Sequence, residues 1–97
     1  MIVRVFEARL RRGADDAFAE ALRDDIATAR RQPGLRSLRW GRRVDEGDTR
    51  VIVVSEWRDL DALRAWLGPG YLQPRYAPGE QSLVVEARVR HYEGLEP

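Results

Sequence analysis

Two segments of this 97-residue chain, residues 2–10 and 50–57, carry apolar side chains on both faces of a strand. Both segments are rich in β-branched and aromatic residues, which favour strands because such side chains pack well on a pleated surface. In the first, Ile2, Phe6, Ala8 and Leu10 share a face with Arg4 and oppose Val3 and Val5; in the second, Val51, Val53 and Trp57 oppose Ile52 and Val54. Leaving four of these side chains in water would cost about 1.5–3 kcal/mol each, so both faces need cover.

The remaining sequence predicts two helices and two further strands, all in a single domain over residues 1–97. Apolar residues recur every three or four positions from residue 14 to residue 32, which indicates a helix that Pro33-Gly34 ends. Asp59 is a suitable N-cap for a second helix over residues 60–67. We expect strands over residues 35–44 and 82–92, a turn at 45–48, a proline- and glycine-rich loop at 68–81 and a frayed tail at 92–97.

This order of elements, β-α-β-β-α-β, predicts the ferredoxin-like α+β fold. In that fold two helices cover one face of a four-stranded antiparallel sheet, and residues 2–10 and 50–57 form its two central strands. The opposite face would remain apolar and uncovered, so we expect a homodimer with two-fold symmetry that forms through this face. The charged residues expected in or at the rim of the interface are Glu7, Arg9, Glu56, Glu86 and Arg88.

Composition excludes several kinds of partner and site. The 17 basic residues, all arginine, oppose 16 acidic ones, and a net charge of +1 argues against a nucleic-acid binder. The chain has no cysteine and one histidine, so we expect no disulfide, no thiolate nucleophile and no metal site. No apolar run approaches roughly 18 residues, so we expect no membrane span, no signal peptide and a cytoplasmic location.

Four features together resemble the antibiotic biosynthesis monooxygenase family of dimeric α+β barrels. They are the opening strand into Gly13, the helix closed by Pro33-Gly34, the strand end Ser55-Glu56-Trp57 and the helix that follows over residues 59–66. The resemblance extends from residue 1 to about residue 92. It implies that two four-stranded sheets meet in a barrel, with one pocket per subunit between the sheet and the second helix. The superfamily includes cofactor-free monooxygenases of phenols, haem-degrading enzymes, decyclases and isomerases.

The resemblance also implies which residues would act in a cofactor-independent monooxygenase. In such an enzyme a phenol or quinol loses a proton, and its electron-rich anion reacts with dioxygen without any cofactor. Trp66 of the second helix, Tyr71 of the next loop and Arg88 of the last strand would be the catalytic residues, and Arg90 has the same strand parity as Arg88. The asparagine that often assists falls on Ala62, which cannot donate a hydrogen bond from its side chain.

Six further residues are candidates for substrate binding: Arg4, Phe6, Trp57, Arg75, Tyr76 and His91. Most of the candidates also have a purely structural interpretation. Arg4 shares a face with apolar residues, where a charge needs a partner or a ligand. Arg75 could reach an anionic ligand or simply stack on a neighbour. Trp66 and the two tyrosines could belong to the core or pin the loop, Trp57 could plug the barrel end, and His91 could lie on the surface or in an interface.

Two alternative functions of the same fold are disfavoured. Haem degradation needs a histidine from the second helix or the following loop and an asparagine on the first strand, whereas residues 58–81 contain no histidine and the chain contains no asparagine. RNA-recognition domains display aromatic residues on their third strand, and Val51 to Ser55 include none.

Two functions therefore remain. The chain is either a monooxygenase acting on a small hydroxylated aromatic or quinol, or a non-catalytic dimer that binds a small apolar ligand or serves as a scaffold. In the first case we expect a cavity bounded by the second helix and the loop over residues 68–81. Trp66 should line that cavity, with Tyr71 or Tyr76 reaching toward it and Arg88 or Arg90 near its polar end.

Overall fold

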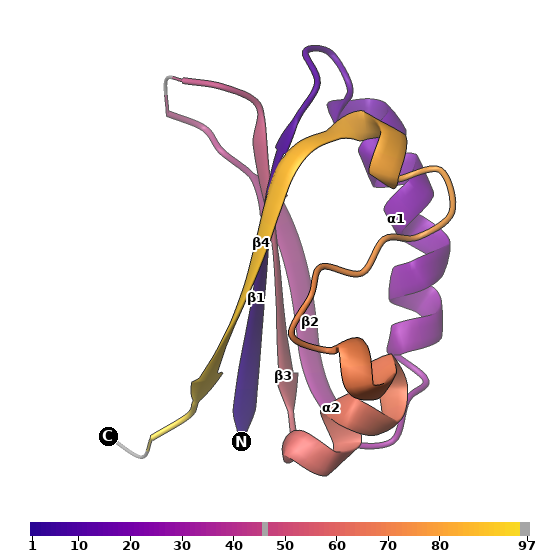
Figure 1. Ribbon diagram of the computed structural model, residues 1–97, viewed down its shortest axis with the longest axis vertical. Coiled ribbons are helices and arrows are strands. Elements are labelled where there is room, and N and C mark those ends of the chain that lie inside the picture. The colour runs from indigo at the N-terminus through magenta and orange to yellow at the C-terminus, as the bar shows by residue number, and fades with distance from the viewer. Residues whose placement is uncertain (46, 96–97) are drawn as a thin grey trace.

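The computed structural model describes residues 1–45 and 47–95 and confirms the predicted order of elements (Figure 1). The strands and helices are β1 (Ile2–Leu10), α1 (Asp15–Ala29), β2 (Leu35–Arg42), β3 (Arg50–Trp57), α2 (Leu60–Leu67) and β4 (Val84–Glu93). Two short 3₁₀ turns, Gly68–Gly70 and Gln81–Leu83, flank the loop before β4. No described helix is both long enough and apolar enough to cross a membrane.

The four strands form one antiparallel sheet in the order β2-β3-β1-β4, with β1 and β3 in the centre as predicted. Val5 pairs with Val54 and Phe6 with Val53, so the two central strands present matching apolar residues to each face. Both helices cover one face of the sheet, and the other face is open (Figure 1). This arrangement is the ferredoxin-like α+β fold.

Local hydrogen bonds determine where the helices begin and end. The Asp59 side chain accepts a hydrogen bond from Ala62 N at 2.8 Å, which confirms Asp59 as the N-cap of α2. α1 ends at Ala29, earlier than predicted, because the next turn tightens and Gln32 N–H bonds to the Ala29 carbonyl. Gly34, with φ of 87°, then brings the chain so close to α2 that a Cβ would lie 2.5 Å from the Ala62 Cβ.

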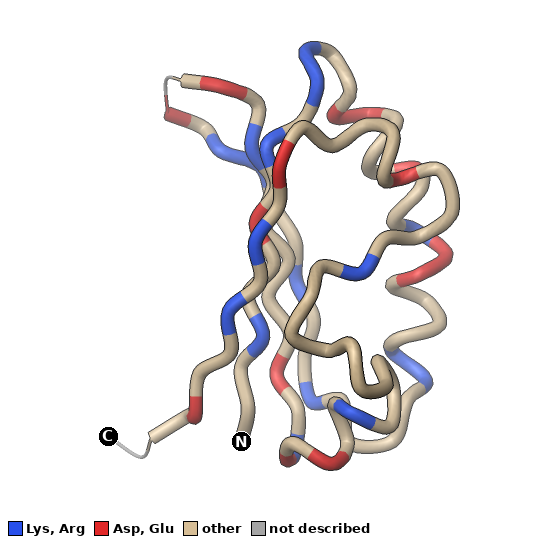
Figure 2. Tube along the Cα trace, in the orientation of Figure 1, with Lys and Arg blue, Asp and Glu red and all other residues tan. Residues whose placement is uncertain are grey.

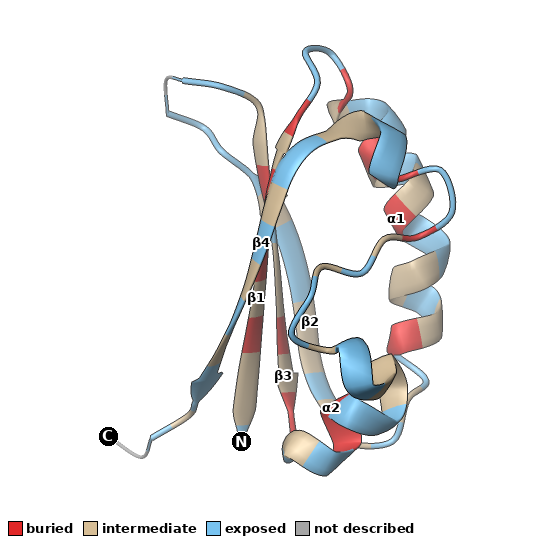
Figure 3. Ribbon diagram, in the orientation of Figure 1, coloured by how far each residue is buried: buried red, intermediate tan, exposed pale blue. Residues whose placement is uncertain are grey.

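Buried side chains form two clusters between the sheet and the helices. Figure 3 marks the buried positions along β1, β3 and both helices. The larger cluster joins β1, β3 and α1 through residues that include Phe6, Phe18 and Val51. The smaller cluster packs Trp57 at the end of β3 against Leu63 of α2. Four side chains of these clusters are almost completely shielded from solvent: Phe18, Val51, Trp57 and Leu63. The two clusters therefore supply most of the apolar burial that holds the helices on the sheet.

β4 begins later than predicted and is irregular near its start. Residues 81–83 form a 3₁₀ turn, and the register of β4 against β1 shifts between Arg9 and Leu10. The shift turns Val85 outward, where it is 45% exposed, and brings Val84 against the larger cluster. The pairing of β4 continues to Glu93, past the point where we expected the tail to fray, and residues 96–97 of that tail lie outside the described residues.

The register of β4 also corrects the prediction for Arg88. Arg4 pairs with His91 and Glu7 pairs with Arg88. Because side chains alternate along a strand, Arg88 and Arg90 point to the open face with Glu7, whereas His91 points to the helix-covered face with Arg4. The expectation that Arg88 or Arg90 lies at the polar end of a cavity under the helices is therefore wrong.

The open face has apolar side chains on its two central strands, flanked by Arg39 and Arg90 on the outer strands, and a cluster of charges at one end. Val3, Val5 and Val54 are half-buried there, and Ile52 is 39% exposed. Acidic and basic residues gather at the end of the sheet next to the turn between β2 and β3 (Figure 2). Ion pairs at this end include Arg50 Nη1 to Glu7 Oε1 at 3.5 Å, Arg9 Nε to Glu86 Oε1 at 3.4 Å and Arg9 Nε to Asp48 Oδ2 at 3.6 Å.

Candidate active site

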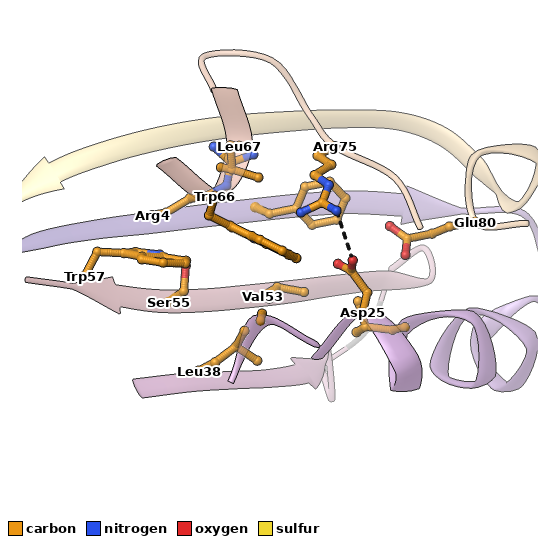
Figure 4. A pocket seen from close by; sticks show the side chains of 13 residues that line it. Arg4, Asp25, Leu38, Val53, Ser55, Trp57, Trp66, Leu67, Arg75 and Glu80 are labelled. Carbon is orange, nitrogen blue, oxygen red and sulfur yellow. Dashed lines mark hydrogen bonds and ion pairs between the residues drawn. The ribbon is translucent and has the colours of Figure 1, made fainter. Parts of the chain in front are cut away.

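A cavity of about 60 Å³ lies between the sheet and the helices, bordered by both clusters of buried side chains (Figure 4). The wall includes residues of β1, β3, α1, α2 and the loop before β4, which confirms the predicted position of the cavity and of Trp66 in its lining. The volume admits a few water molecules and is well below the roughly 300–1,000 Å³ typical of a small-molecule pocket. The polar residues of the wall are Arg4, Asp25, Ser55, Arg75 and Glu80.

The indole of Trp66 is covered by Arg75. The guanidinium carbon of Arg75 lies 4.0 Å from the centroid of the Trp66 ring, which is a cation–π contact. The same guanidinium forms an ion pair through Nη2 with Asp25 Oδ1 of α1 at 3.5 Å, as the dashed line in Figure 4 marks. Arg75 thus stacks on a neighbour, which was one of its two predicted interpretations, and it occupies the ring face that an aromatic ligand would use.

Arg4 of β1 is a buried cation without an opposite charge beside it. It is 7% exposed, and its guanidinium donates to the carbonyls of Tyr71 at 2.5 Å and Gln73 at 3.2 Å. Among the described residues, no carboxylate lies within the 4.0 Å of an ion pair with Arg4. Burial, and then the charge of Arg75, lower the pKa of Arg4 to about 10. The group therefore stays protonated at neutral pH, with neutral hydrogen-bond partners but no opposite charge beside it.

His91 of β4 completes the surroundings of Arg4. Its Nε2 lies 2.8 Å from Arg4 Nη1 and accepts the hydrogen bond, because a guanidinium has only donors. Burial, and then the charge of Arg4, lower the pKa of His91, which keeps the ring neutral at neutral pH. The Tyr71 ring packs edge-on against His91 with centroids 5.3 Å apart. His91 is thus half-buried beneath the helix side of the sheet and holds Arg4 in place.

The other predicted aromatic residues divide into two groups. Phe6 and Trp57 line the cavity, and Trp57 is anchored by a hydrogen bond of 3.0 Å from its Nε1 to Ser55 Oγ. Tyr71 and Tyr76 do not line it. Arg64 covers the Tyr71 ring at 5.1 Å, and the Tyr76 ring meets Phe6 edge-on at 6.2 Å. The two tyrosines thus anchor the loop. We expected one of them to reach toward Trp66 in the cavity, but neither lines it.

Two carboxylates in the cavity wall were missed by the analysis of the sequence. Asp25 had a signal that we did not use, because it lies three residues after Leu22 and four before Ala29, on the buried stripe of α1. Glu80 had no such signal, because it belongs to an irregular loop whose contacts have no periodicity. No group of three metal-ligating side chains occurs within residues 1–45 and 47–95.

Glu80 is the most buried charged residue of the site, at 2% exposed. Its Oε2 accepts a hydrogen bond of 3.4 Å from Ala77 N. Burial raises the pKa of Glu80 to about 7; the nearby charge of Asp25 also raises it, while the Ala77 hydrogen bond and Arg75 oppose the rise. The cavity therefore has a fixed cation in Arg4 and an acid that changes protonation near neutral pH in Glu80.

Comparison with known proteins gives one family. A model of the antibiotic biosynthesis monooxygenases matches residues 1–73. No curated protein matches the sequence significantly.

Solved structures share the whole fold at low sequence identity. A protein from Nitrosomonas europaea assigned to the antibiotic biosynthesis monooxygenases has a TM-score of 0.80 at 22% identity, over 99% of this chain and 100% of that one. SnoaB, a cofactor-independent oxygenase from Streptomyces nogalater, has a TM-score of 0.75 at 24% identity, over 99% and 94%. A mutant of MhuD with two manganese protoporphyrin IX molecules per active site has a TM-score of 0.75 at 17% identity, over 100% and 97%.

Proposed function

The chain belongs to the antibiotic biosynthesis monooxygenase family, and on this premise we propose that it is a cofactor-independent monooxygenase that oxidises a small hydroxylated aromatic or quinol with dioxygen. The structural similarity to SnoaB, a cofactor-independent oxygenase, supports this class of reaction. The observation that carries the proposal is the buried guanidinium of Arg4, which lines the cavity with no carboxylate partner among the described residues.

An aryloxide is the kind of ligand that this guanidinium lacks. When a substrate hydroxyl loses its proton, negative charge develops on the oxygen, and a cation held in a site shielded from water stabilises it strongly. The Tyr71 and Gln73 carbonyls and His91 hold Arg4 in place before substrate binds. In this proposal Arg4 has the role that the family resemblance implied for Arg88, but it comes from the neighbouring strand of the same sheet.

The reaction needs no electron donor besides the substrate. A phenol that becomes a quinone loses the hydroxyl hydrogen and one ring hydrogen, and both leave in a molecule of water. One atom of dioxygen becomes the new carbonyl oxygen and the other becomes the oxygen of that water. The substrate gives up four electrons and dioxygen accepts four. The protein's contribution is to hold the anion, orient the ring and exclude solvent.

Trp66 would supply the surface on which the substrate ring stacks. Its indole already holds a flat cation, the Arg75 guanidinium, at 4.0 Å from the ring centroid. Arg75 is partly exposed and bound to Asp25 at 3.5 Å, a contact that is weak enough to break when an aromatic ring takes its place. Movement of Arg75 would enlarge the cavity beyond its present 60 Å³ or so, which is too small for a naphthalene.

The residues present fit a haem poorly, so the proposal includes no cofactor. The one histidine of the chain, His91, uses its Nε2 to accept from Arg4 and packs behind the Tyr71 ring. To serve as the axial ligand of a haem, His91 would have to break its contacts with both Arg4 and Tyr71.

We also propose that two copies of the chain form a homodimer through the open face of the sheet. The central strands carry Val3, Val5, Ile52 and Val54 on this face, and burying such side chains contributes about 1.5–3 kcal/mol each. The ion pairs at the charged end would then lie at the rim, where charges remain partly solvated.

The small cavity is the specific observation that favours the second function, a non-catalytic dimer that serves as a scaffold or binds a small apolar ligand. Oxygen uptake separates the two functions. We expect wild-type protein to consume oxygen with at least one member of a panel of hydroxynaphthalenes and anthrones, whereas a scaffold consumes none with any of them.

Variants then test the assigned roles. Arg4→Met should lower kcat/KM about 100-fold, because it removes the donor to the developing anion. Arg88→Met is the matched control on the open face and should retain activity within about threefold. Trp66→Ala should lower kcat/KM about tenfold, a larger effect than its packing loss has on the melting temperature, and Trp66→Phe should keep most of the activity. Equal losses in Arg88→Met and Arg4→Met would contradict the role given to Arg4.

A further inference from the structure

The mechanism above uses Arg4 and Trp66 but leaves Glu80 without a role. Glu80 lines the same cavity, and its side chain is almost completely buried. Within the described part of the chain, no basic nitrogen lies within 4.0 Å of its carboxylate, and its hydrogen bond is the long one of 3.4 Å from Ala77 N. A carboxylate has about four acceptor positions, so Glu80 retains most of its capacity to accept protons or hydrogen bonds.

A structural role alone accounts poorly for this side chain. The turn that precedes β4 already has backbone hydrogen bonds of 3.0 Å from Glu80 N to the Ala77 carbonyl and from Leu83 N to the Glu80 carbonyl. One long hydrogen bond to Ala77 N adds little to them. An apolar side chain would fill the same space without the cost of burying a carboxylate, so the buried acid indicates a use in the cavity.

The charged and titratable groups around Glu80 come from two elements. Asp25 of α1 disfavours the ionised form, Arg75 of the loop favours it, and Tyr76 of the loop is itself affected by the Glu80 charge, since burial and then Glu80 raise the Tyr76 pKa. With burial as the main cause, the pKa of Glu80 is about 7. A base works best when its pKa is close to the working pH, because it is then both ionised and able to hold a proton.

Figure 4 shows Arg4 and Glu80 at opposite ends of the cavity, with Trp66 and Arg75 between them. We propose that Glu80 is the catalytic base of this site and takes the proton of a substrate hydroxyl at the end of the cavity opposite Arg4. This inference rests on the proposed monooxygenase function. It adds the substrate class: an aromatic ring with a hydroxyl at one end and a conjugated oxygen, a carbonyl or second hydroxyl, at the other.

The proton transfer is balanced and uses both ends of the cavity. The substrate O–H bond breaks, its proton forms an O–H bond on the Glu80 carboxylate, and the electron pair stays on the substrate oxygen. The resulting charge delocalises into the ring and, where the far substituent is a carbonyl, onto that oxygen, which Arg4 stabilises. Where the far substituent is a second hydroxyl, its oxygen takes up none of the charge and accepts a hydrogen bond from Arg4, which holds the ring in place. The electron-rich anion then reacts with dioxygen, and protonated Glu80 returns its proton when water leaves. A substrate with one oxygen substituent could use only one of the two groups.

Glu80→Gln separates proton transfer from packing. The glutamine has nearly the same shape, and its amide oxygen can still accept from Ala77 N, but it cannot take a proton. The matched control is Glu20→Gln on the exposed face of α1. We would measure oxygen uptake with 1,4-dihydroxynaphthalene from pH 5 to pH 9. Wild type and Glu20→Gln should show kcat/KM rising through about pH 7. Glu80→Gln should be at least about 100-fold slower on the plateau and should lack this rise.

Substrate acidity and ligand binding complete the test. Glu80→Gln should recover to within about fivefold of wild type on electron-poor naphthols that ionise without help, because these need no base. Equal losses on acidic and weakly acidic substrates, or an unchanged pH profile, would overturn the role of Glu80.

A binding experiment tests the contact with Glu80 separately from catalysis. Without oxygen, 4-hydroxybenzaldehyde should bind wild type about tenfold more tightly than 4-methoxybenzaldehyde, and this preference should shrink to about threefold in Glu80→Gln. A preference equal in both proteins overturns the contact with Glu80. If the preference holds but wild type consumes no oxygen with any substrate, the proposed function fails and the Glu80 contact stands only as a binding contact.

Discussion

At the charged end of the open face, Arg9 and Arg50 lie within reach of opposite charges, whereas on the helix-covered face the two most buried charged residues do not. Arg50 lies 3.5 Å from Glu7 and Arg9 lies 3.4 Å from Glu86 on the open side. Arg4 and Glu80, 7% and 2% exposed, have no ion-pair partner within residues 1–45 and 47–95.

This difference indicates that the charged residues of the two faces have different functions. An exposed ion pair contributes at most about 1 kcal/mol and costs little to form. A buried charge without a partner costs several kcal/mol and persists only where something else depends on it. The covered face keeps Arg4 and Glu80 in the wall of a cavity, which fits a ligand with matching groups. The open face keeps apolar side chains on its two central strands and its ion pairs at one end, which fits a second copy of the chain.

The largest effect should come from a charge added to the open face. Val3→Glu adds a carboxylate to the proposed interface with Glu56 and Tyr92 as its cross-strand neighbours, so it has no basic partner there and would cost about 3–5 kcal/mol on association. We expect the wild type to sediment as a dimer at low micromolar concentration and Val3→Glu to be monomeric or insoluble.

A second valine provides the control for this experiment. Val44 is 97% exposed, next to the β2–β3 turn, so Val44→Glu should remain dimeric. A stable wild-type monomer in equilibrium sedimentation would contradict our account of the open face, and the comparison of the two faces would then lose its explanation.

On the covered face, the next largest effect should follow from the pH dependence of stability. Burial raises the pKa of Glu80 from 4.5 to about 7. Between these values the folded protein binds more protons than the unfolded chain, so the Glu80 contribution to stability falls as pH rises through this window. The full loss above about pH 7 is about 3 kcal/mol.

Urea unfolding at pH 5 and pH 8 measures this loss by comparison of wild type with Glu80→Gln. The substitution removes the Glu80 slope, so the variant should gain relative to wild type as pH rises. His91 gives the opposite slope, because its pKa is lowered on folding, but it is present in both proteins and cancels in the difference. A difference that does not change with pH would mean that Glu80 is solvated like the charges of the open face.

The sequence predicted the fold because the relevant signals are periodic and local. The two-sided apolar pattern identified β1 and β3 as central strands, Asp59 marked the start of α2, and the parity of Arg4 placed it under the helices. Each of these depends on a spacing or on a cap that a few neighbouring residues define.

The site was predicted only in part because its remaining features depend on contacts between distant segments. The register shift near the start of β4 is not visible in the alternation of its residues, and the alignment of Arg88 with the family arginine gave no information on which face it occupies. Arg75 meets Trp66 and Asp25, and Glu80 enters the cavity, only because an irregular loop follows one path across the helices. No periodicity encodes that path.

A smaller effect should come from uncovering Trp66 within the cavity. Arg75→Ala removes the cation that lies over the indole and should strengthen binding of neutral 1-naphthol about fivefold, or about 1 kcal/mol, because the ligand no longer displaces a side chain. Arg64→Ala is the matched control, since it removes a similar contact over Tyr71 at 5.1 Å that lies outside the cavity lining. Titration calorimetry should show a change in the first variant alone. Weaker binding by Arg75→Ala would mean that Arg75 contacts the ligand.

The smallest effect should come from removing one partner of an ion pair on the open face. Arg9 lies between two carboxylates, Glu86 at 3.4 Å and Asp48 at 3.6 Å, and the Glu86 side chain is half exposed. Glu86→Gln removes the contact with Arg9 and a second one with Arg50 at 3.6 Å, but both arginines keep Asp48 as a partner. Water already screens both lost contacts, so the free energy of unfolding should change by less than about 1 kcal/mol. Urea unfolding should be measured in low salt and in 1 M salt. In 1 M salt the Debye screening length falls to about 3 Å, so the difference between the variant and wild type should fall toward zero. A loss above about 2 kcal/mol that survives high salt would mean that Glu86 is desolvated in the dimer, as Arg4 and Glu80 are beneath the helices, and the proposed rim would then belong to the interior of the interface.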